Sequence, residues 1–230
     1  MASTSDALGA LTEEMVACSA CPRLVAWREQ VAREKRAAYQ GEEYWGRPVP
    51  GFGDPAARVL IVGLAPAAHG GNRTGRIFTG DRSGDWLFGS LHRTGYASQP
   101  TSTRPDDGLA LRDAYVAAAV RCAPPANMPT PDERDRCLPY LVRELALLER
   151  VRVIVVLGKF AYDAAARVVA DVGSPLPKPR PRFAHGVEVR SERYVVLGSF
   201  HPSQQNTFTG KLTEPMLDEI FDRARVLSGT

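Results

Sequence analysis

Four short apolar segments, separated by helical patterns, constrain the fold of this 230-residue chain more than any other feature. A strand covered on both faces lacks polar alternation, so each segment predicts a buried strand. The segments are 58–66, 114–122, 152–158 and 194–200. Helical periodicity occupies 10–38, with a break at a Cys-Pro step, and also 84–94, 132–150, 159–171 and 213–227. This alternation predicts an α/β fold with a mostly parallel sheet between helical layers.

The length and composition favour one domain. Residues 1–9 are small and polar, which predicts a flexible tail and leaves 10–230 as a single domain. No apolar run approaches the roughly 20 residues of a membrane span, and the first residues lack a signal-peptide pattern. We therefore expect a cytoplasmic protein. A net charge of +3 permits a nucleic-acid partner without requiring one.

The most unusual loops follow the predicted strands, at 63–81, 121–130 and 201–211. In parallel sheets, ligands bind outside the carboxyl ends of the strands, so these loops predict a site at one edge. The first loop is rich in glycine, which lets backbone N–H groups approach an anion or a base closely. It matches neither the P-loop nor the dinucleotide-binding pattern, and a flexible crossover is the alternative.

The four cysteines are Cys18 and Cys21, in a C-x2-C arrangement, and the distant Cys122 and Cys137. In a cytoplasmic chain they do not predict a disulfide framework. Four thiolates suit either zinc or an iron–sulfur cluster, and free thiols are the remaining alternative.

Two motifs and the cysteines carry a family resemblance. The segment GLAPAAHGGNRTGRIFTGD, at 63–81, resembles the first motif of the type-5 uracil-DNA glycosylases, and HPSQQN, at 201–206, resembles the second motif of that superfamily. The cysteines resemble the four ligands of the [4Fe–4S] cluster in the type-4 and type-5 branches. The resemblance implies a three-layer α/β/α fold with a central four-stranded parallel sheet. It also implies a [4Fe–4S] cluster held by all four cysteines, and removal of flipped-out uracil from double-stranded DNA.

The resemblance assigns roles to three residues. His201 would donate to a carbonyl oxygen of the departing base, Phe78 would stack on that base, and Asn127 would read its edge with a side-chain amide. His201 also lies at a strand end before a proline, which suits a rigidly held ring. The alternatives are a capping or surface histidine, a core aromatic residue and an ordinary asparagine turn.

The source of the attacking water is harder to assign. Ala65 and Ala67 lie in Gly63-Leu64-Ala65-Pro66-Ala67, which is apolar where other superfamily members carry a carboxylate. Asp81 is the nearest carboxylate; it either assists the reaction or caps the helix that follows, and both options stay open. Ala65 and Ala67 are expected to line the base pocket. Ala67 replaces a tyrosine that excludes larger bases, which implies that hypoxanthine is also a substrate.

The remaining expectations concern DNA and partners. Gln205 is expected to probe the minor groove, and Ser203 is also expected to contact DNA. Three further residues are expected to contact a phosphate or the pocket wall: Asn72, Arg73 and Arg76. Solvated loop residues are the alternative for this set. No lysine matches a position suited to a Schiff base, so we expect an enzyme that leaves an abasic site without cutting the strand. A DNA groove on one face is compatible with a monomer, which is the expected state. The rival functions are an iron–sulfur DNA-binding or electron-transfer module and a phosphate-binding α/β enzyme.

Overall fold

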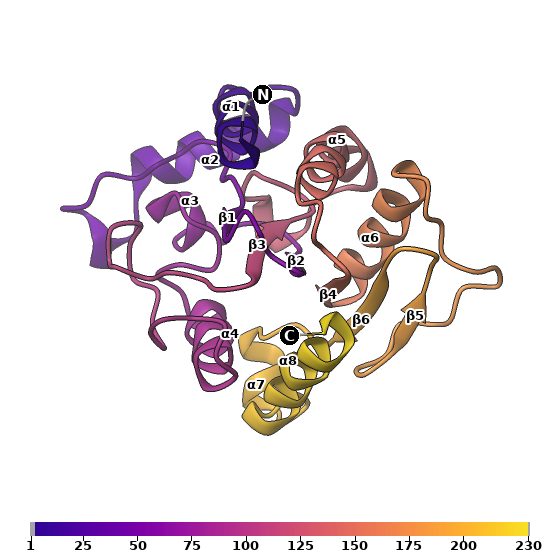
Figure 1. Ribbon diagram of the computed structural model, residues 1–230. Helices are drawn as coiled ribbons and strands as arrows, with labels where there is room; N and C mark the ends of the chain where they lie inside the picture. Colours follow the sequence, from indigo (N-terminus) through magenta and orange to yellow (C-terminus); the bar gives the residue numbers. More distant parts are fainter. Residues whose placement is uncertain (1–2, 230) are drawn as a thin grey trace.

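The structure, a computed structural model, describes residues 3–229 and consists of helices on both faces of a central sheet (Figure 1). Four parallel strands form the centre of the sheet in the order β3-β2-β4-β6. Every residue of these strands is buried, which explains why their sequences are apolar without alternation. The strands are β2 (Val59–Gly63), β3 (Ala114–Ala118), β4 (Val153–Leu157) and β6 (Val195–Ser199).

The sheet has six strands, not the four that were predicted. Two short antiparallel strands extend its edges: β1 (Phe52–Gly53) pairs with β3, and β5 (Glu188–Arg190) pairs with β6. The predicted α/β class is therefore confirmed, whereas the four-stranded parallel sheet is only the centre of a mixed one. Strands of two and three residues have no periodicity that a sequence can reveal, and β1 lies in a segment rich in Gly and Pro.

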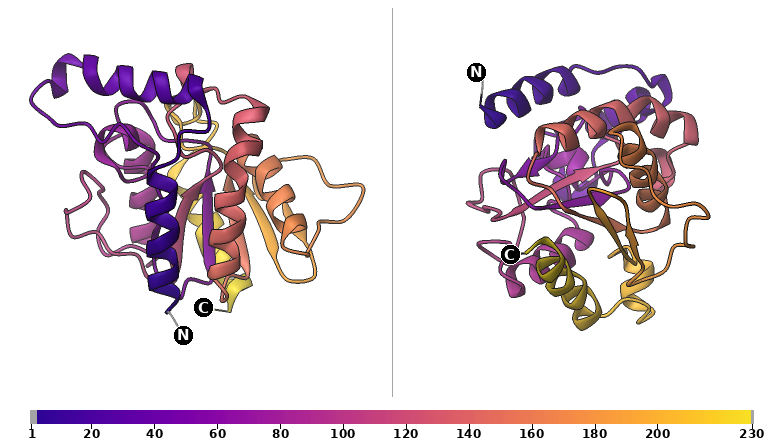
Figure 2. Two further views of the ribbon diagram at one scale, coloured as in Figure 1. Left: turned by 90° about the horizontal axis from the view of Figure 1, so that it is seen from above. Right: turned by 45° about the vertical axis from the view of Figure 1, so that its right-hand side comes forward.

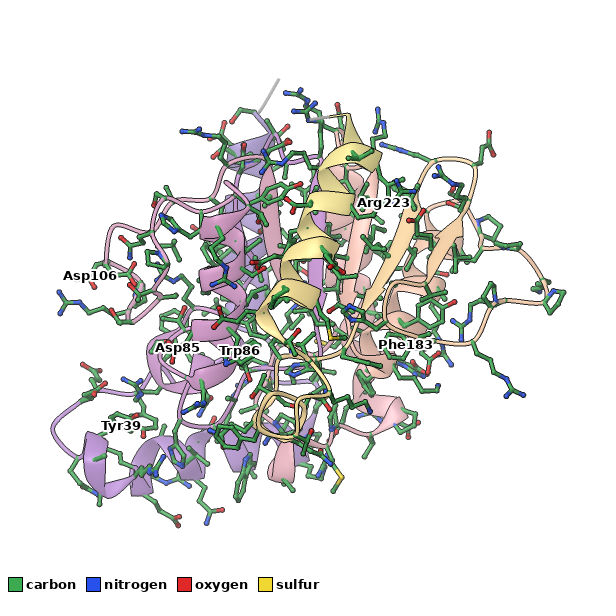
Figure 3. The ribbon with its side chains drawn as sticks, turned by 90° about the horizontal axis from the view of Figure 1, so that it is seen from below. Tyr39, Asp85, Trp86, Asp106, Phe183 and Arg223 are labelled. Carbon is green, nitrogen blue, oxygen red and sulfur yellow. The ribbon has the colours of Figure 1, made fainter. Side chains whose placement is uncertain are left out.

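Two hydrophobic cores hold the helices against the sheet. Helices α1 (Thr4–Val16), α5 (Pro131–Leu147) and α6 (Lys159–Asp171) pack on one face. Helices α4 (Arg82–Arg93) and α8 (Glu214–Ser228) pack on the other. Figure 1 shows these two helical layers on opposite sides of the strands. In Figure 3, Arg223 of α8 lies beside β5, and its guanidinium pairs with Glu188, with Nε 2.5 Å from Oε1.

The N-terminal segment differs from the predicted flexible tail. Helix α1 begins at Thr4, because the Ser3 hydroxyl accepts from the Asp6 backbone N–H and the Asp6 carboxylate accepts from that of Ser3. This reciprocal capping satisfies backbone donors at the helix start. Leu8 then joins the core beneath α5. Residues 1 and 2, which belong to the same predicted tail, lie outside the described residues.

The remaining elements lie in connections between the main ones. Helix α2 (Pro22–Glu34) starts directly after Cys21, with proline at its first position, which confirms the predicted break. The short elements are α3 (Gly71–Thr74), α7 (Gln204–Phe208), and the 3₁₀ turns η1 (Ala37–Tyr39) and η2 (Pro125–Asn127). Both ends of the described chain lie at one end of the molecule (Figure 2, left). Among residues 3–229, no helix is long and apolar enough to cross a membrane.

Candidate active site

The loops after the central strands meet at one edge of the sheet, as the sequence predicted. Because β2, β3, β4 and β6 are parallel, their carboxyl ends share an edge. Gly63 ends β2, Gly158 follows β4, and His201 lies two residues after the end of β6. The site is therefore built from segments that are far apart in the chain, since Gly63 and His201 are separated by more than one hundred residues.

Phe78 and His201 lie side by side at this edge. Their ring centroids are 6.0 Å apart, and the ring planes are inclined by 34°. Phe78 is buried and has a φ of 53°, an uncommon backbone conformation for an aromatic residue. Two glycines make room for it: a Cβ on Gly63 would lie 2.7 Å from the Phe78 ring, and one on Gly84 would lie 1.9 Å from its carbonyl oxygen. The Phe78 ring is thus fixed against the end of β2.

His201 is held by its backbone and is half-buried. The Asn206 side chain donates to the His201 carbonyl oxygen at 2.9 Å, and a Cβ on Gly158 would touch the His201 Cβ at 3.4 Å. Burial lowers the pKa of His201 to about 4 because the charged imidazolium loses its hydration. The ring is therefore neutral at pH 7, with one nitrogen able to donate a proton in a hydrogen bond and the other able to accept one.

Asp81 is the N-cap of α4. Its Oδ1 accepts from the Gly84 backbone N–H at 3.0 Å, which confirms the helix-capping option. Its Oδ2 faces Gly70, where a Cβ would come within 2.0 Å of it. Burial raises the pKa of Asp81, while hydrogen bonds from Gly84 and Ser83 oppose that shift. Capping engages Oδ1, so a second function of Oδ2 is compatible with this geometry.

Three predicted DNA contacts are buried and have intramolecular partners. Asn72 is fully buried, and its Nδ2 donates to the Arg28 carbonyl oxygen at 3.2 Å. Arg73 pairs with Glu42 and donates to two backbone carbonyls, and its guanidinium stacks 4.0 Å above the Tyr39 ring. Figure 3 shows Tyr39 near the outer margin of the molecule. This placement differs from the prediction of phosphate contacts, because the Asn72 amide nitrogen and the Arg73 guanidinium already bond within the protein.

Arg76 is likewise part of the scaffold. It is 7% exposed, forms an ion pair with Asp107 at 2.7 Å, and donates to the hydroxyls of Ser102 and Thr79. These contacts tie the first loop to residues 100–108. Arg76 is therefore placed to hold the loop and not to meet a phosphate, which corrects the prediction for this residue.

The other predicted pocket residues lie closer to the surface. Ala65 and Ala67 are half-buried in the loop after β2, and Ser203 is half-buried at the start of α7. Asn127 and Gln205 are exposed. Asn127 has a φ of 56° in the turn after β3, a conformation that asparagine tolerates better than most residues. Their exposure leaves both side chains free to meet a partner molecule.

The four cysteines line one cavity between α2, α5 and the end of β3. Cys18, Cys21, Cys122 and Cys137 all border it. Burial raises the pKa values of the Cys21 and Cys122 thiols and raises that of Cys137 to about 12. Among residues 3–229, however, no group of three or more His, Cys, Asp or Glu side chains is close enough to hold a metal ion.

Comparison with known proteins identifies the family. Residues 50–225 match the model of the uracil DNA glycosylase superfamily. The chain belongs to this superfamily. It is 54% identical to a type-5 uracil-DNA glycosylase of Mycobacterium bovis over 92% of this chain and 78% of that protein. It is 50% identical to a type-5 enzyme of Thermus thermophilus over 96% and 98% of the two chains.

Within the superfamily the chain is of type 5. A type-4 uracil-DNA glycosylase of Archaeoglobus fulgidus is 36% identical over 67% of this chain and 70% of that protein, a more limited match. The predicted membership of the type-5 uracil-DNA glycosylases is thus confirmed. The chain is accordingly a DNA glycosylase, an enzyme that hydrolyses N-glycosidic bonds.

Sequence analysis of this uracil-DNA glycosylase missed several residues at the site. Gly70 and Gly158 permit close approach to Asp81 and His201, but a glycine in a loop does not reveal what it faces. Arg28 and Arg121 border the cysteine cavity, and neither has any motif around it. Arg121 precedes Cys122 directly, and that adjacency was the one available signal.

Proposed function

We propose that this enzyme removes uracil and other deaminated bases, including hypoxanthine, from double-stranded DNA. The observation that carries the proposal is the fixed pair of Phe78 and the neutral His201 at the carboxyl edge of the sheet. A target base inside a duplex is inaccessible to such a pair, so the nucleotide must rotate out of the helix into the site. An aromatic face and a hydrogen-bond donor are what an extruded base requires.

His201 would act on the departing base. As the glycosidic bond breaks, negative charge develops on the base, and a donor aimed at its carbonyl oxygen stabilises that charge. A neutral imidazole keeps its donor proton while the base leaves as an anion. Loss of one such donor costs about 2.7–4 kcal/mol of transition-state stabilisation, so His201→Ala is expected to slow base release by about two to three orders of magnitude.

Asp81 would contribute through the oxygen that does not cap α4. Placed near the first loop, its carboxylate would orient the attacking water or stabilise positive charge on the sugar. Two variants separate this function from capping. Asp81→Asn and Asp81→Ser both supply a capping oxygen but remove the charge, so the fold should persist while base release falls. Unchanged rates in both variants would assign Asp81 to the helix alone.

The small Ala67 supports a broad substrate range. It occupies a half-buried position in the loop after β2, the loop that also carries Phe78, and its methyl group takes up little room there. Base release from duplexes containing uracil, hypoxanthine, xanthine or mismatched thymine measures the range directly. Ala67→Tyr should retain uracil release and lose hypoxanthine release. Wild-type activity confined to uracil would refute the broad range.

We further propose that the reaction is simple hydrolysis by a monomer and leaves an abasic site. A strand-cleaving mechanism would need an amine that forms a Schiff base with the sugar. Borohydride should therefore trap no covalent protein–DNA complex, and the product strand should break only after alkali treatment. A borohydride-trapped complex would show that a lysine takes part.

A [4Fe–4S] cluster held by Cys18, Cys21, Cys122 and Cys137 completes the proposal. Two observations support the fit: the four thiols border one cavity, and buried arginine N–H groups without partners border it too. Zinc at about 2.3 Å from each sulfur would need the thiols in mutual contact, whereas a cluster binds each thiolate to a separate iron. When bound, the cluster would cross-link α2, α5 and the loop after β3, and would take no part in base release.

One experiment tests the function as a whole. Base release is measured on duplexes with U·G and hypoxanthine·T pairs, using wild-type protein, His201→Ala and Asp81→Asn. Release that His201→Ala abolishes supports the proposed chemistry. An intact, iron-containing protein that releases no base would instead favour an iron–sulfur DNA-binding or electron-transfer module.

A further inference from the structure

Arg28 is a buried cation without a counter-ion. It lies on α2, is 6% exposed, and forms no ion pair within residues 3–229. Its Nη1 lies 2.9 Å from the Cys122 sulfur, both terminal nitrogens donate to the Cys18 carbonyl oxygen at 3.3 Å, and its Nε has no partner. Burying a charge in this way is costly unless an anion lies nearby. The nearest candidate acceptors are the cysteines themselves.

Arg121 is a second buried arginine that borders the cysteine cavity. It is 1% exposed and pairs with the equally buried Glu144 through Nη2. Its Nε and Nη1 have no hydrogen-bond partner, although buried N–H groups are rarely left unpaired. Its backbone N–H donates to the Cys137 sulfur at 3.3 Å. Both arginines border the cavity that the four cysteines line.

We propose that Arg28 and Arg121 are positioning residues that donate hydrogen bonds to the sulfur atoms of the [4Fe–4S] cluster, and that Arg28 also compensates its charge. The inference rests on the cluster proposed above. Four thiolates and a [4Fe–4S]²⁺ core carry a net charge of about −2, which a low-dielectric cavity can hold only if cations accompany it. The unpartnered N–H groups and the unpaired charge of Arg28 supply what such an anion needs.

This arrangement predicts the direction in which the midpoint potential of the cluster shifts when the Arg28 charge is removed. Each one-electron reduction adds negative charge to the cluster, and a nearby cation stabilises the more negative state. Removing the Arg28 charge should therefore shift the midpoint potential to a more negative value. It should also speed loss of iron to a chelator, because the remaining anion is less well stabilised.

The experiment uses the loaded full-length protein. Voltammetry over both the oxidative and reductive couples is recorded for wild type, Arg28→Gln and Arg28→Lys. Arg136→Gln is the control, because Arg136 borders the same cavity and loses the same charge but is exposed to water. Arg28→Gln should lower the ratio of reduced to oxidised cluster at least tenfold at fixed potential, about 59 mV for one electron. Arg28→Lys should shift less, and the control should stay near wild type.

Arg121 needs a paired substitution, because replacing it alone would leave the buried Glu144 carboxylate without a counter-ion. Arg121→Met with Glu144→Gln keeps the net charge of the pair while deleting the donor groups, and the wild-type protein, which has the same net charge, is its control. Resonance Raman spectra should then show higher Fe–S(Cys) stretching frequencies for the double variant than for its control, since the sulfurs have lost N–H donors. Iron release should also be faster.

Two measurements distinguish failure of this inference from failure of the cluster proposal. Iron and sulfide analysis of the wild type comes first: four of each per chain supports the cluster, and their absence or replacement by zinc removes the cluster proposal itself. If the cluster is present but Arg28→Gln matches Arg136→Gln in potential and iron release, only the proposed function of the arginines fails. A variant that does not fold is replaced by Arg28→Lys, which keeps the charge and changes the donor geometry.

Discussion

Lowering the pH tests directly whether burial keeps the His201 imidazole neutral. An ordinary histidine with a pKa of about 6.5 is about 97% protonated at pH 5, whereas His201, with a pKa of about 4, would be about 9% protonated. The difference between these pKa values corresponds to on the order of 3 kcal/mol against protonation in the folded state. It arises from burial alone and not from a charged neighbour. The donor in the site should therefore stay neutral across the range in which exposed histidines change charge.

The sign of the linked stability change follows from the lowered pKa. Between about pH 6.5 and pH 4 the unfolded chain binds more protons at this position than the folded chain, so stability falls as the pH falls through that window. Above about pH 6.5 both states are neutral, and the contribution is fully present. In a series measured from pH 8 to pH 4, His201→Gln should lose less stability than wild type.

Proton NMR of the imidazole signals provides the direct assay. The chain has four histidines, so the spectrum is simple, and the signal missing from His201→Gln identifies the residue. We expect its titration midpoint near pH 4, and a pH–rate profile for uracil release without an inflection at pH 6.5 from this group. A midpoint close to 6.5 would refute the reasoning, because it would show that water reaches the ring freely.

Two further predictions concern the loop after β2. Gly70→Ala places a Cβ against the Asp81 carboxylate. It should therefore weaken the α4 cap by about 1 kcal/mol, measured by thermal unfolding, and should reduce uracil release. Gly41→Ala is the control, because its Cβ would meet no atom within 4 Å, and it should change neither property. Arg76→Met leaves the buried Asp107 carboxylate without a counter-ion, so it should cost about 3–5 kcal/mol of unfolding free energy. It should not change the salt dependence of DNA binding; a smaller salt slope would show that Arg76 contacts a phosphate.

The sequence predicted the central part of the fold because its signals were physical necessities of burial. A strand covered on both faces must be apolar throughout, and each of the four predicted segments contains one of the buried parallel strands. Strands β1 and β5 escaped prediction because two or three paired residues create no pattern. The first residues of helix α1, before the predicted start at residue 10, escaped because they depend on reciprocal capping by Ser3 and Asp6, a local feature that a polar composition conceals.

At the site, the motifs located the residues but not their surroundings. The sequence placed Phe78 and His201 together, and the structure brings their rings to 6.0 Å. It also assigned the charged residues of the first loop to DNA, because Arg73 and Arg76 carry groups that commonly bind phosphates. Their ion-pair partners, Glu42 and Asp107, lie about thirty residues away in the chain, and such pairing leaves no trace in the local sequence.

The short edge strands β1 and β5 affect the tendency of this protein to aggregate at high concentration. A long exposed edge offers unpaired N–H and C=O groups on which a neighbouring molecule can build, and this is a common route to aggregation. Here β1 ends one side of the sheet after two residues, and β5 ends the other after three. These short strands pair with the outer strands of the apolar parallel centre, β3 and β6. The folded chain should therefore aggregate less through its sheet edges than a four-stranded sheet without β1 and β5 would.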